Sequence, residues 1–184
     1  MIMGHTNPDI DAMGSSMGIY RLARSMNKNA YIVNSTIGSA LENFKDELAK
    51  DSEYEDVLIS KEVAIENVEE NTLLVIVDTH KKNYVESPEL LKKAKKIVII
   101  DHHRRSADYI EDVTLTFQEV YASSAAELVT ELLQYTETKV NLKTIEAESL
   151  YAGIMMDTKN FTFKTGVRTF EAAAYLRKCG VDII

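Results

Sequence analysis

Two continuous apolar runs, TLLVIVD at 72–78 and KIVIID at 96–101, most strongly limit what this chain can fold into. Neither run alternates apolar with polar residues, as a strand with one solvent-exposed face does. Runs without alternation are typical of strands covered on both faces, and such strands are usually parallel. The two runs therefore predict the centre of a parallel sheet buried between layers of helices.

The segments around these runs predict the covering layers. Apolar residues recur at helical spacing, and one further helix begins at a favourable first-turn proline. The predicted helices cover residues 11–26, 40–50, 88–94, 123–136, 142–158 and 167–180, and AYIVN at 30–34 is predicted to be a short strand. Strands and helices alternate over the first two-thirds of the chain. This order indicates an α/β fold with a mainly parallel sheet and helices on both faces.

The length and the two ends of the chain suggest a single domain cut from a longer protein. A chain of 184 residues is long enough for one domain with a sizeable core. Only MIM precedes the first polar motif, which is too short for a complete strand, and the chain stops just after Gly180, a residue suited to a helix C-cap. We therefore expect the start of the first strand to be missing.

Charge and composition exclude several classes of function. The chain has 21 Lys and Arg against 29 Asp and Glu, so its net charge of -8 argues against binding duplex nucleic acid. No apolar run approaches the ~18–20 residues that span a bilayer, and no signal peptide is visible. The single Cys179 excludes an internal disulfide framework and fits a reducing compartment.

The histidines are concentrated at predicted strand ends. The chain has four, His5, His80, His102 and His103, and each lies directly after a strand or its remnant. In open α/β sheets, ligands sit beyond the carboxyl ends of the strands. We therefore expect the three polar clusters to face one crevice.

Carboxylates accompany these histidines, and their charges favour metal binding. Several carboxylates crowded in one crevice are unfavourable unless cations neutralise them. The candidate ligands are His5, Asp9, Asp11, Asp78, His102 and Asp157. Two divalent ions would balance the four carboxylates, and mixed imidazole and carboxylate ligation favours Mn²⁺ or related ions. Such a pair of ions catalyses phosphoester hydrolysis.

Simpler interpretations exist for individual residues. Asp9 or Asp11 alone is most simply a helix N-cap. Ser124 and Glu127 have the spacing of a capping box, and Arg168 resembles a solvated first-turn residue. These alternatives do not explain why all the histidines coincide with acidic strand ends.

The motifs HTNPDID, VDTH and DHH, followed by Asp157, resemble the four signature motifs of the DHH phosphoesterase superfamily. Longer segments, IDHHRRSADYI, YASSAAELVTELLQY and TGVRTFEAAAYLRKCG, are similar to the DHH domain of the GdpP type. The resemblance implies that residues 1–184 are a DHH catalytic domain without its DHH-associated substrate-binding domain. It further implies hydrolysis of cyclic di-AMP to pApA with two divalent ions, Mn²⁺ by expectation, in the cytoplasmic part of a protein anchored in the bacterial cell membrane.

The resemblance also implies roles for individual residues. One metal would be bound by His5, Asp9 and Asp78, and the other by Asp11, Asp78, His102 and Asp157. His103 would contact the scissile phosphate, with Asp78 and His102 completing the catalytic group, and Asp101 would orient the histidine pair. Ser123 and Ser124 would receive a phosphate through backbone donors, and Arg104, Arg105 and Arg168 are weaker candidates for substrate contact.

Other functions of the same motifs remain open. The domain could instead be an exonuclease or oligoribonuclease acting on short linear RNA, or a metal-binding sensor module without turnover. A pyrophosphatase fits less well, because the RRS and TGVRTFEAAAYLR segments do not suggest one. The expected partner is a cyclic dinucleotide or short oligonucleotide, with no membrane contact by the domain itself, and the sequence leaves open whether it forms a homodimer.

Overall fold

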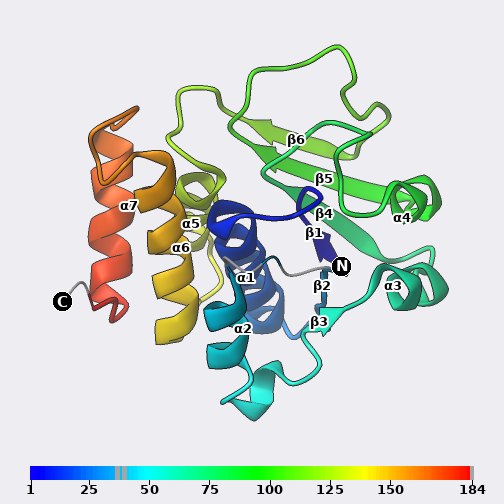
Figure 1. The fold of residues 1–184 in the computed structure, drawn as a ribbon, viewed down its shortest axis with the longest axis horizontal. Helices are drawn as coiled ribbons and strands as arrows, with labels where there is room; N and C mark the ends of the chain where they lie inside the picture. The colour runs from blue at the N-terminus through cyan, green and yellow to red at the C-terminus, as the bar shows by residue number, and fades with distance from the viewer. Residues whose placement is uncertain (36–37, 39–40, 183–184) are drawn as a thin grey trace.

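The computed structural model of the protein describes residues 1–35, 38 and 41–182. Within these residues, six strands form one sheet in the order β3-β2-β1-β4-β5-β6, and every neighbouring pair is parallel (Figure 1). The strands are β1 (Ile2–Met3), β2 (Ile32–Val33), β3 (Leu58–Ile59), β4 (Leu73–Val77), β5 (Lys96–Asp101) and β6 (Leu115–Gln118). The two apolar runs of the sequence are therefore the two longest strands, and they lie side by side.

Helices cover both faces of this sheet, as the sequence predicts. They are α1 (Ile10–Ser25), α2 (Glu42–Leu48), α3 (Lys61–Asn67), α4 (Pro88–Lys93), α5 (Ala125–Tyr135), α6 (Thr144–Asp157) and α7 (Val167–Lys178). Figure 1 shows α1, α5, α6 and α7 on one side of the sheet and α3 and α4 on the other. Within the described residues, no helix is long and apolar enough to cross a membrane.

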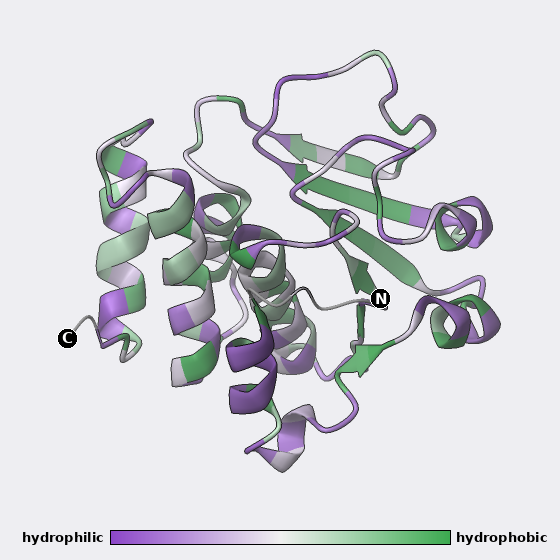
Figure 2. Ribbon diagram, in the orientation of Figure 1, coloured by the Kyte–Doolittle hydropathy of each residue, from purple (hydrophilic) through white to green (hydrophobic). Residues whose placement is uncertain are grey.

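The central strands are buried on both faces because their side chains alternate between two cores. Along β4, Val75 and Val77 belong to the core that α1, α5, α6 and α7 share. The intervening Leu74 and Ile76 belong to the second core, beneath α3 and α4. Figure 2 shows β4 and β5 in the hydrophobic colour over most of their length. Both faces of the central strands are covered by helices, which explains why their sequences do not alternate between apolar and polar residues.

Helices α1 and α6 pack closely against each other. A Cβ added at Gly14 of α1 would lie 2.3 Å from the carbonyl oxygen of Ser149 on α6, far inside van der Waals contact. A Cβ added at Gly153 of α6 would lie 3.0 Å from both Cα and Oδ1 of Asp11. The missing side chains thus allow α6 to approach the first turn of α1, where a candidate ligand lies.

A buried polar network fixes the other end of the same helix pair. The Glu146 carboxylate, fully buried near the start of α6, accepts hydrogen bonds from Arg21 Nε at 2.8 and 2.9 Å. It also accepts the hydroxyl of Tyr54 at 2.8 Å and the N–H of Lys143 at 2.9 Å. A buried carboxylate is tolerated when it is paired and hydrogen-bonded in this way.

Some elements differ from the sequence predictions. Strand β3 and helix α3 were not predicted, because β3 has two residues and α3 buries only Ala64. Strand β6 was also missed, because Thr116 and Gln118 give this edge strand a polar pattern. The predicted helix at 40–50 is observed as α2, and residue 40 lies outside the described residues.

Candidate metal centre

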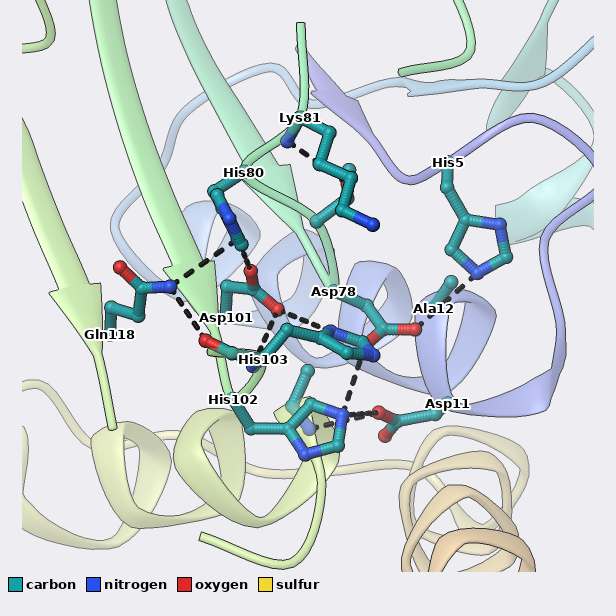
Figure 3. Close-up of polar contacts among 12 residues, drawn as sticks. His5, Asp11, Ala12, Asp78, His80, Lys81, Asp101, His102, His103 and Gln118 are labelled. Carbon is teal, nitrogen blue, oxygen red and sulfur yellow. Dashed lines mark hydrogen bonds and ion pairs between the residues drawn. The ribbon is translucent and has the colours of Figure 1, made fainter. Parts of the chain in front are cut away.

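The strand order creates a crevice between β1 and β4. These neighbours occupy the middle of the sheet, and the chain continues from them toward opposite edges, to β2 and to β5. A crevice at such a reversal of strand order is the usual ligand site of open α/β folds. His5 follows β1, Asp78 follows β4 and His102 follows β5, so the three polar clusters meet there (Figure 3).

Asp78 lies at the centre of the crevice. Its two carboxylate oxygens face different histidines: Oδ2 lies 3.4 Å from Nε2 of His5, and Oδ1 lies 3.3 Å from Nε2 of His102. The residue is buried and has a φ of 59°, a left-handed conformation uncommon for residues other than glycine. Strained backbone of this kind is concentrated at functional sites, and here it directs a carboxylate between two imidazoles.

One group of potential metal ligands consists of His5, Asp9 and Asp78, which each offer a ligand atom within 4.8 Å of the others. Nδ1 of His5 contacts the carbonyl oxygen of Thr6 at 3.0 Å, which requires a proton on Nδ1, and Nε2 is the nitrogen that faces both carboxylates. The ring also stacks on Tyr84 with an interplanar angle of 8°. A histidine fixed in this tautomer and orientation is well prepared to bind a metal.

Asp9 also serves as the N-cap of α1. Its Oδ1 accepts the N–H groups of Asp11 and Ala12 at 3.0 and 3.1 Å. The simpler interpretation of Asp9 is therefore correct as far as it goes. It does not exclude ligation, because a carboxylate has enough lone pairs for both.

A second group consists of Asp11, His102 and Asp157. Nε2 of His102 lies 3.8 Å from Oδ2 of Asp11 and 3.3 Å from Oδ2 of Asp157, the last residue of α6. Both oxygens of Asp11 accept N–H groups at the start of α5, from Ala125 and Ala126 at 2.8 Å each. Asp11 therefore caps a distant helix rather than its own, and that helix fixes the direction of its carboxylate.

Three atoms at the centre of this crevice are buried and have no hydrogen-bond partner. They are Oδ1 of Asp78 and both ring nitrogens of His102, whose contacts with carboxylates are close but lack hydrogen-bond geometry. Buried polar atoms are rarely left unpaired, and each one needs an explanation. A divalent cation bound by these donors would satisfy Asp78 and one nitrogen of His102, so the residues present fit a metal site.

The pKa values express the same crowding of charge. Burial raises the pKa of Asp11 well above its ordinary value, and the charges of Asp78 and Asp157 raise it further. Burial likewise raises the pKa of Asp157. Burial would lower the pKa of His5, but its contact with Asp78 outweighs this and raises it to about 9. Burial opposes the lowering of the Asp78 pKa, but its contacts with His102 and His5 outweigh burial and lower it. The site thus favours added positive charge next to its carboxylates.

Asp101 lies behind the crevice and holds two histidines. Its Oδ1 accepts the backbone N–H of His103 at 3.2 Å and Nδ1 of the same ring at 2.8 Å, and its Oδ2 makes a very short contact with Nδ1 of His80. Burial raises the pKa of Asp101, but the contacts with His103 and His80 outweigh it and lower the pKa to about 2. The sequence alone indicates no role for His80. Its only signal there was the final residue of VDTH.

His103 is the exposed member of the group. Its ring points into the crevice (Figure 3), its side chain is 53% exposed, and its Nδ1 lies 3.6 Å from Oδ1 of Asp78. The hydrogen bond to Asp101 raises the pKa of His103, although burial opposes this. An imidazole anchored through Nδ1 leaves Nε2 free to contact a substrate.

The predicted phosphate contact of Ser123 and Ser124 does not fit the structure. Both residues are buried. Ser124 Oγ accepts the N–H of Glu127 at 3.0 Å, while the N–H and hydroxyl of Ser123 donate to the Glu127 carboxylate. Since Asp11 takes the next two N–H groups, four backbone donors at the start of α5 already have acceptors within the protein. The two serines cap the helix, as the simpler interpretation of this segment had it.

The three arginine candidates differ in position. Arg168 makes two hydrogen bonds to Glu131 of α5, at 2.5 and 2.6 Å, and thereby joins α7 to α5. Arg104 and Arg105 instead line a cavity of about 1000 Å³ that opens beside His102. The structure therefore brings two of the three toward the crevice and engages the third elsewhere.

The fold and the two ligand groups agree with the comparison with known families. The chain belongs to the DHH family, since the description "DHH family, N-terminal domain" matches residues 1–154. It is 46% identical over 186 residues to the cyclic-di-AMP phosphodiesterase GdpP of Bacillus subtilis, an alignment that covers 100% of this chain and 28% of that protein.

Two other comparisons extend this result. The chain is 27% identical to the bifunctional oligoribonuclease and PAP phosphatase NrnA of Mycoplasma genitalium, covering 100% of this chain and 54% of that protein. Among solved structures, an exopolyphosphatase-related protein from Bacteroides fragilis aligns with a TM-score of 0.81 at 24% identity, over 98% of this chain and 52% of the other. That likeness shows the fold alone. The chain spans about half the length of these two proteins and less than a third of the Bacillus subtilis relative.

Proposed function

We propose that this chain is the catalytic domain of a two-metal phosphodiesterase that hydrolyses cyclic di-AMP to pApA. The observation that carries the proposal is the pair of ligand groups that meet at Asp78, with unpartnered buried atoms on Asp78 and His102. The similarity to named cyclic-di-AMP phosphodiesterases supports the substrate. The parent protein would be anchored in the bacterial cell membrane with this domain in the cytoplasm, and the extra length of the relatives leaves room for such an anchor.

The assignment of ligands follows the geometry. His5, Asp9 and Asp78 would hold one cation, and Asp11, His102 and Asp157 the other, with Asp78 offering one oxygen to each group. The mixture of imidazole and carboxylate donors favours Mn²⁺ over cations that prefer only oxygen ligands. When bound, a pair of divalent ions acidifies the attacking water and offsets the charge that builds on the phosphoryl oxygens.

The protein's own residues orient the substrate and manage protons. His103, held through Nδ1 by Asp101, presents Nε2 to the phosphate and donates a proton toward the leaving oxygen. His80 holds the other oxygen of Asp101, and the N–H of Ser106 donates to Nε2 of His80 at 2.9 Å. This chain of contacts fixes the orientation of both rings, so that His103 in its doubly protonated form directs its Nε2–H into the crevice.

The test is chromatographic and uses a matched pair of variants. The chain is incubated with cyclic di-AMP and Mn²⁺, with an EDTA control, and the products are separated. We expect pApA only when Mn²⁺ is available. Asp78→Asn should abolish product formation and reduce the bound metal below two equivalents. Asp46→Asn, an exposed carboxylate on α2, should change neither.

Two alternatives remain, and the same assays separate them. An oligoribonuclease, which the relative from Mycoplasma genitalium favours, would degrade short linear RNA in preference to the cyclic dinucleotide. A sensor module would bind metal without turnover of either substrate. Two equivalents of Mn²⁺ with no product from any phosphodiester would therefore contradict the proposed activity.

A further inference from the structure

An aromatic cavity adjoins the candidate metal centre and is not explained by it. The cavity has a volume of about 1000 Å³, within the range of small-molecule sites, and His102 forms part of its lining. Tyr121, from the loop between β6 and α5, contributes to one part of the lining, and Phe161 and Phe170, from the end of α6 onward, contribute to another. A substrate at the metals would therefore extend into this space.

The aromatic side chains of the cavity are unusually exposed. Tyr121 is 89% exposed and Phe170 is 57% exposed. Phe170 stacks on Phe161, with ring centroids 5.7 Å apart and an interplanar angle of 16°, so the neighbouring ring supports one of its faces. Flat, supported rings left open to solvent next to a reactive centre are suited to stacking against another planar ring.

The backbone that presents Phe161 is strained. Lys159, Asn160 and Phe161 have consecutive φ values of 48°, 57° and 62°, in the left-handed region that bulky residues avoid. Thr158, fully buried, holds this turn: its Oγ1 accepts the N–H of Phe161 at 2.9 Å. Since Asp157 immediately precedes Thr158, one short segment positions both a candidate ligand and an aromatic ring of the cavity. Such strain persists where it positions a functional group.

The cavity also contains free positive charge in an acidic protein. Arg104 and Lys164 line it, and among the described residues neither has an acidic group within 4 Å, although the chain as a whole carries a charge of -8. Arg105 lies over the ring of Tyr109, 3.9 Å from its centroid. By contrast, Arg21 and Arg168 are held by glutamates. Cations left unpaired beside aromatic rings suit a ligand that carries both a phosphate and a planar base.

We propose that this cavity is a nucleotide subsite, in which a base of the substrate stacks on the exposed face of Phe170. Arg104 and Lys164 contact the phosphate that is not cleaved. The inference rests on the proposed phosphodiesterase function, since it takes the occupant to be the second nucleotide of the same substrate. It assigns base recognition to this chain and explains the exposed rings, the strained turn and the unpaired cations together.

The test measures binding rather than turnover. The Mn²⁺-loaded chain is titrated calorimetrically with 5′-AMP and with ribose 5-phosphate, which lacks the base. We expect 5′-AMP to bind about 10-fold more tightly, as base stacking predicts. Phe170→Ala should remove this difference, and Phe170→Trp should retain it.

Two controls separate the parts of the subsite. Phe163 is similarly exposed, at 52%, but does not line the cavity, so Phe163→Ala should leave both affinities unchanged. Arg104→Ala should weaken 5′-AMP and ribose 5-phosphate by the same factor, because both carry the phosphate. A circular dichroism melt confirms that each variant is folded.

The outcomes distinguish this inference from the proposed function. Equal binding of the two ligands, absence of binding, or an unchanged preference in Phe170→Ala would overturn the subsite; the exposed rings would then be left for contact with another protein segment. A preference for 5′-AMP that depends on Phe170, in a chain that does not cleave cyclic di-AMP, would retain the subsite and refute the activity.

Discussion

The close packing of α1 on α6 predicts that Gly14→Ala destabilises the protein, although helix propensity alone predicts that it stabilises it. Gly14 lies within α1, and replacing a glycine inside a helix with alanine ordinarily stabilises a protein by about 1 kcal/mol. Here the new Cβ would lie 2.3 Å from the carbonyl oxygen of Ser149, more than 1 Å inside ordinary contact. The obstructing atom belongs to the backbone of α6 and cannot rotate away. Gly14→Ala must therefore push the two helices apart.

The magnitude follows from the two opposing effects. Overpacking of this kind costs about 3 kcal/mol, at the upper end of the usual range because backbone must move. Subtracting the gain in helix propensity leaves a net loss of about 2 kcal/mol. With an unfolding slope of about 2 kcal/mol/M in urea, the midpoint should fall by about 1 M. Gly38→Ala, whose Cβ would meet nothing within 4 Å, should leave the midpoint almost unchanged.

The same variant should affect the two ligand groups unequally. Asp11 is on α1 and Asp157 ends α6, so separating the helices draws that group apart, whereas the group around His5 depends on neither α6 nor its packing. We expect one equivalent of Mn²⁺ to weaken more than the other in a calorimetric titration. If Gly14→Ala is as stable as the wild type, with the same slope of unfolding free energy against urea concentration, then α1 and α6 are not in close contact at Gly14.

Three further predictions concern metal, pH and the α5–α7 contact. Mn²⁺ at 100 times its dissociation constant should raise the free energy of unfolding by about 2.7 kcal/mol, and the melting temperature by about 8 °C, with EDTA reversing the effect. An unchanged melting temperature would contradict the metal site. Because the pKa of Asp101 in the folded chain is lowered to about 2, its stabilising contribution is fully present above about pH 4 and is lost as the pH falls toward 2. Asp101→Asn should therefore flatten that part of the acid unfolding curve, and a curve of unchanged steepness would argue against its contacts. Arg168→Met should cost about 1 kcal/mol in urea unfolding, by removing the pair with Glu131, and leave KM unchanged; a large rise in KM would restore its predicted role in substrate contact.

The sequence was most informative where burial is complete. The runs at 72–78 and 96–101 predicted β4 and β5 to within a residue at each end, because strands covered on both faces must be apolar throughout. The α/β class, the parallel sheet and helices on both faces are confirmed. Strands β3 and β6 escaped prediction because edge strands and two-residue strands need little apolar character.

Part of the candidate site could likewise be predicted from the sequence, and part could not. The structure brings the six candidate ligands into two adjoining groups, because the carboxyl ends of parallel strands share one edge of the sheet. Their role as metal ligands stays a prediction. The contact of His80 with Asp101 joins residues on different strand ends and has no signature in spacing. The aromatic cavity depends on the left-handed turn at 159–161. This turn contains no glycine, so the sequence did not indicate a left-handed conformation there.

The packing of α6 on α1 also bears on how the chain is synthesised. Helix α1 leaves the ribosome roughly 120 residues before α6, which at about 5–20 residues per second corresponds to about 6–24 seconds. Until α6 appears, Gly14 lacks the helix against which it packs, and Asp11 lacks its neighbour Asp157. The nascent chain thus exposes apolar surface until α6 has been synthesised, and this makes α1 the segment on which we expect chaperones to act.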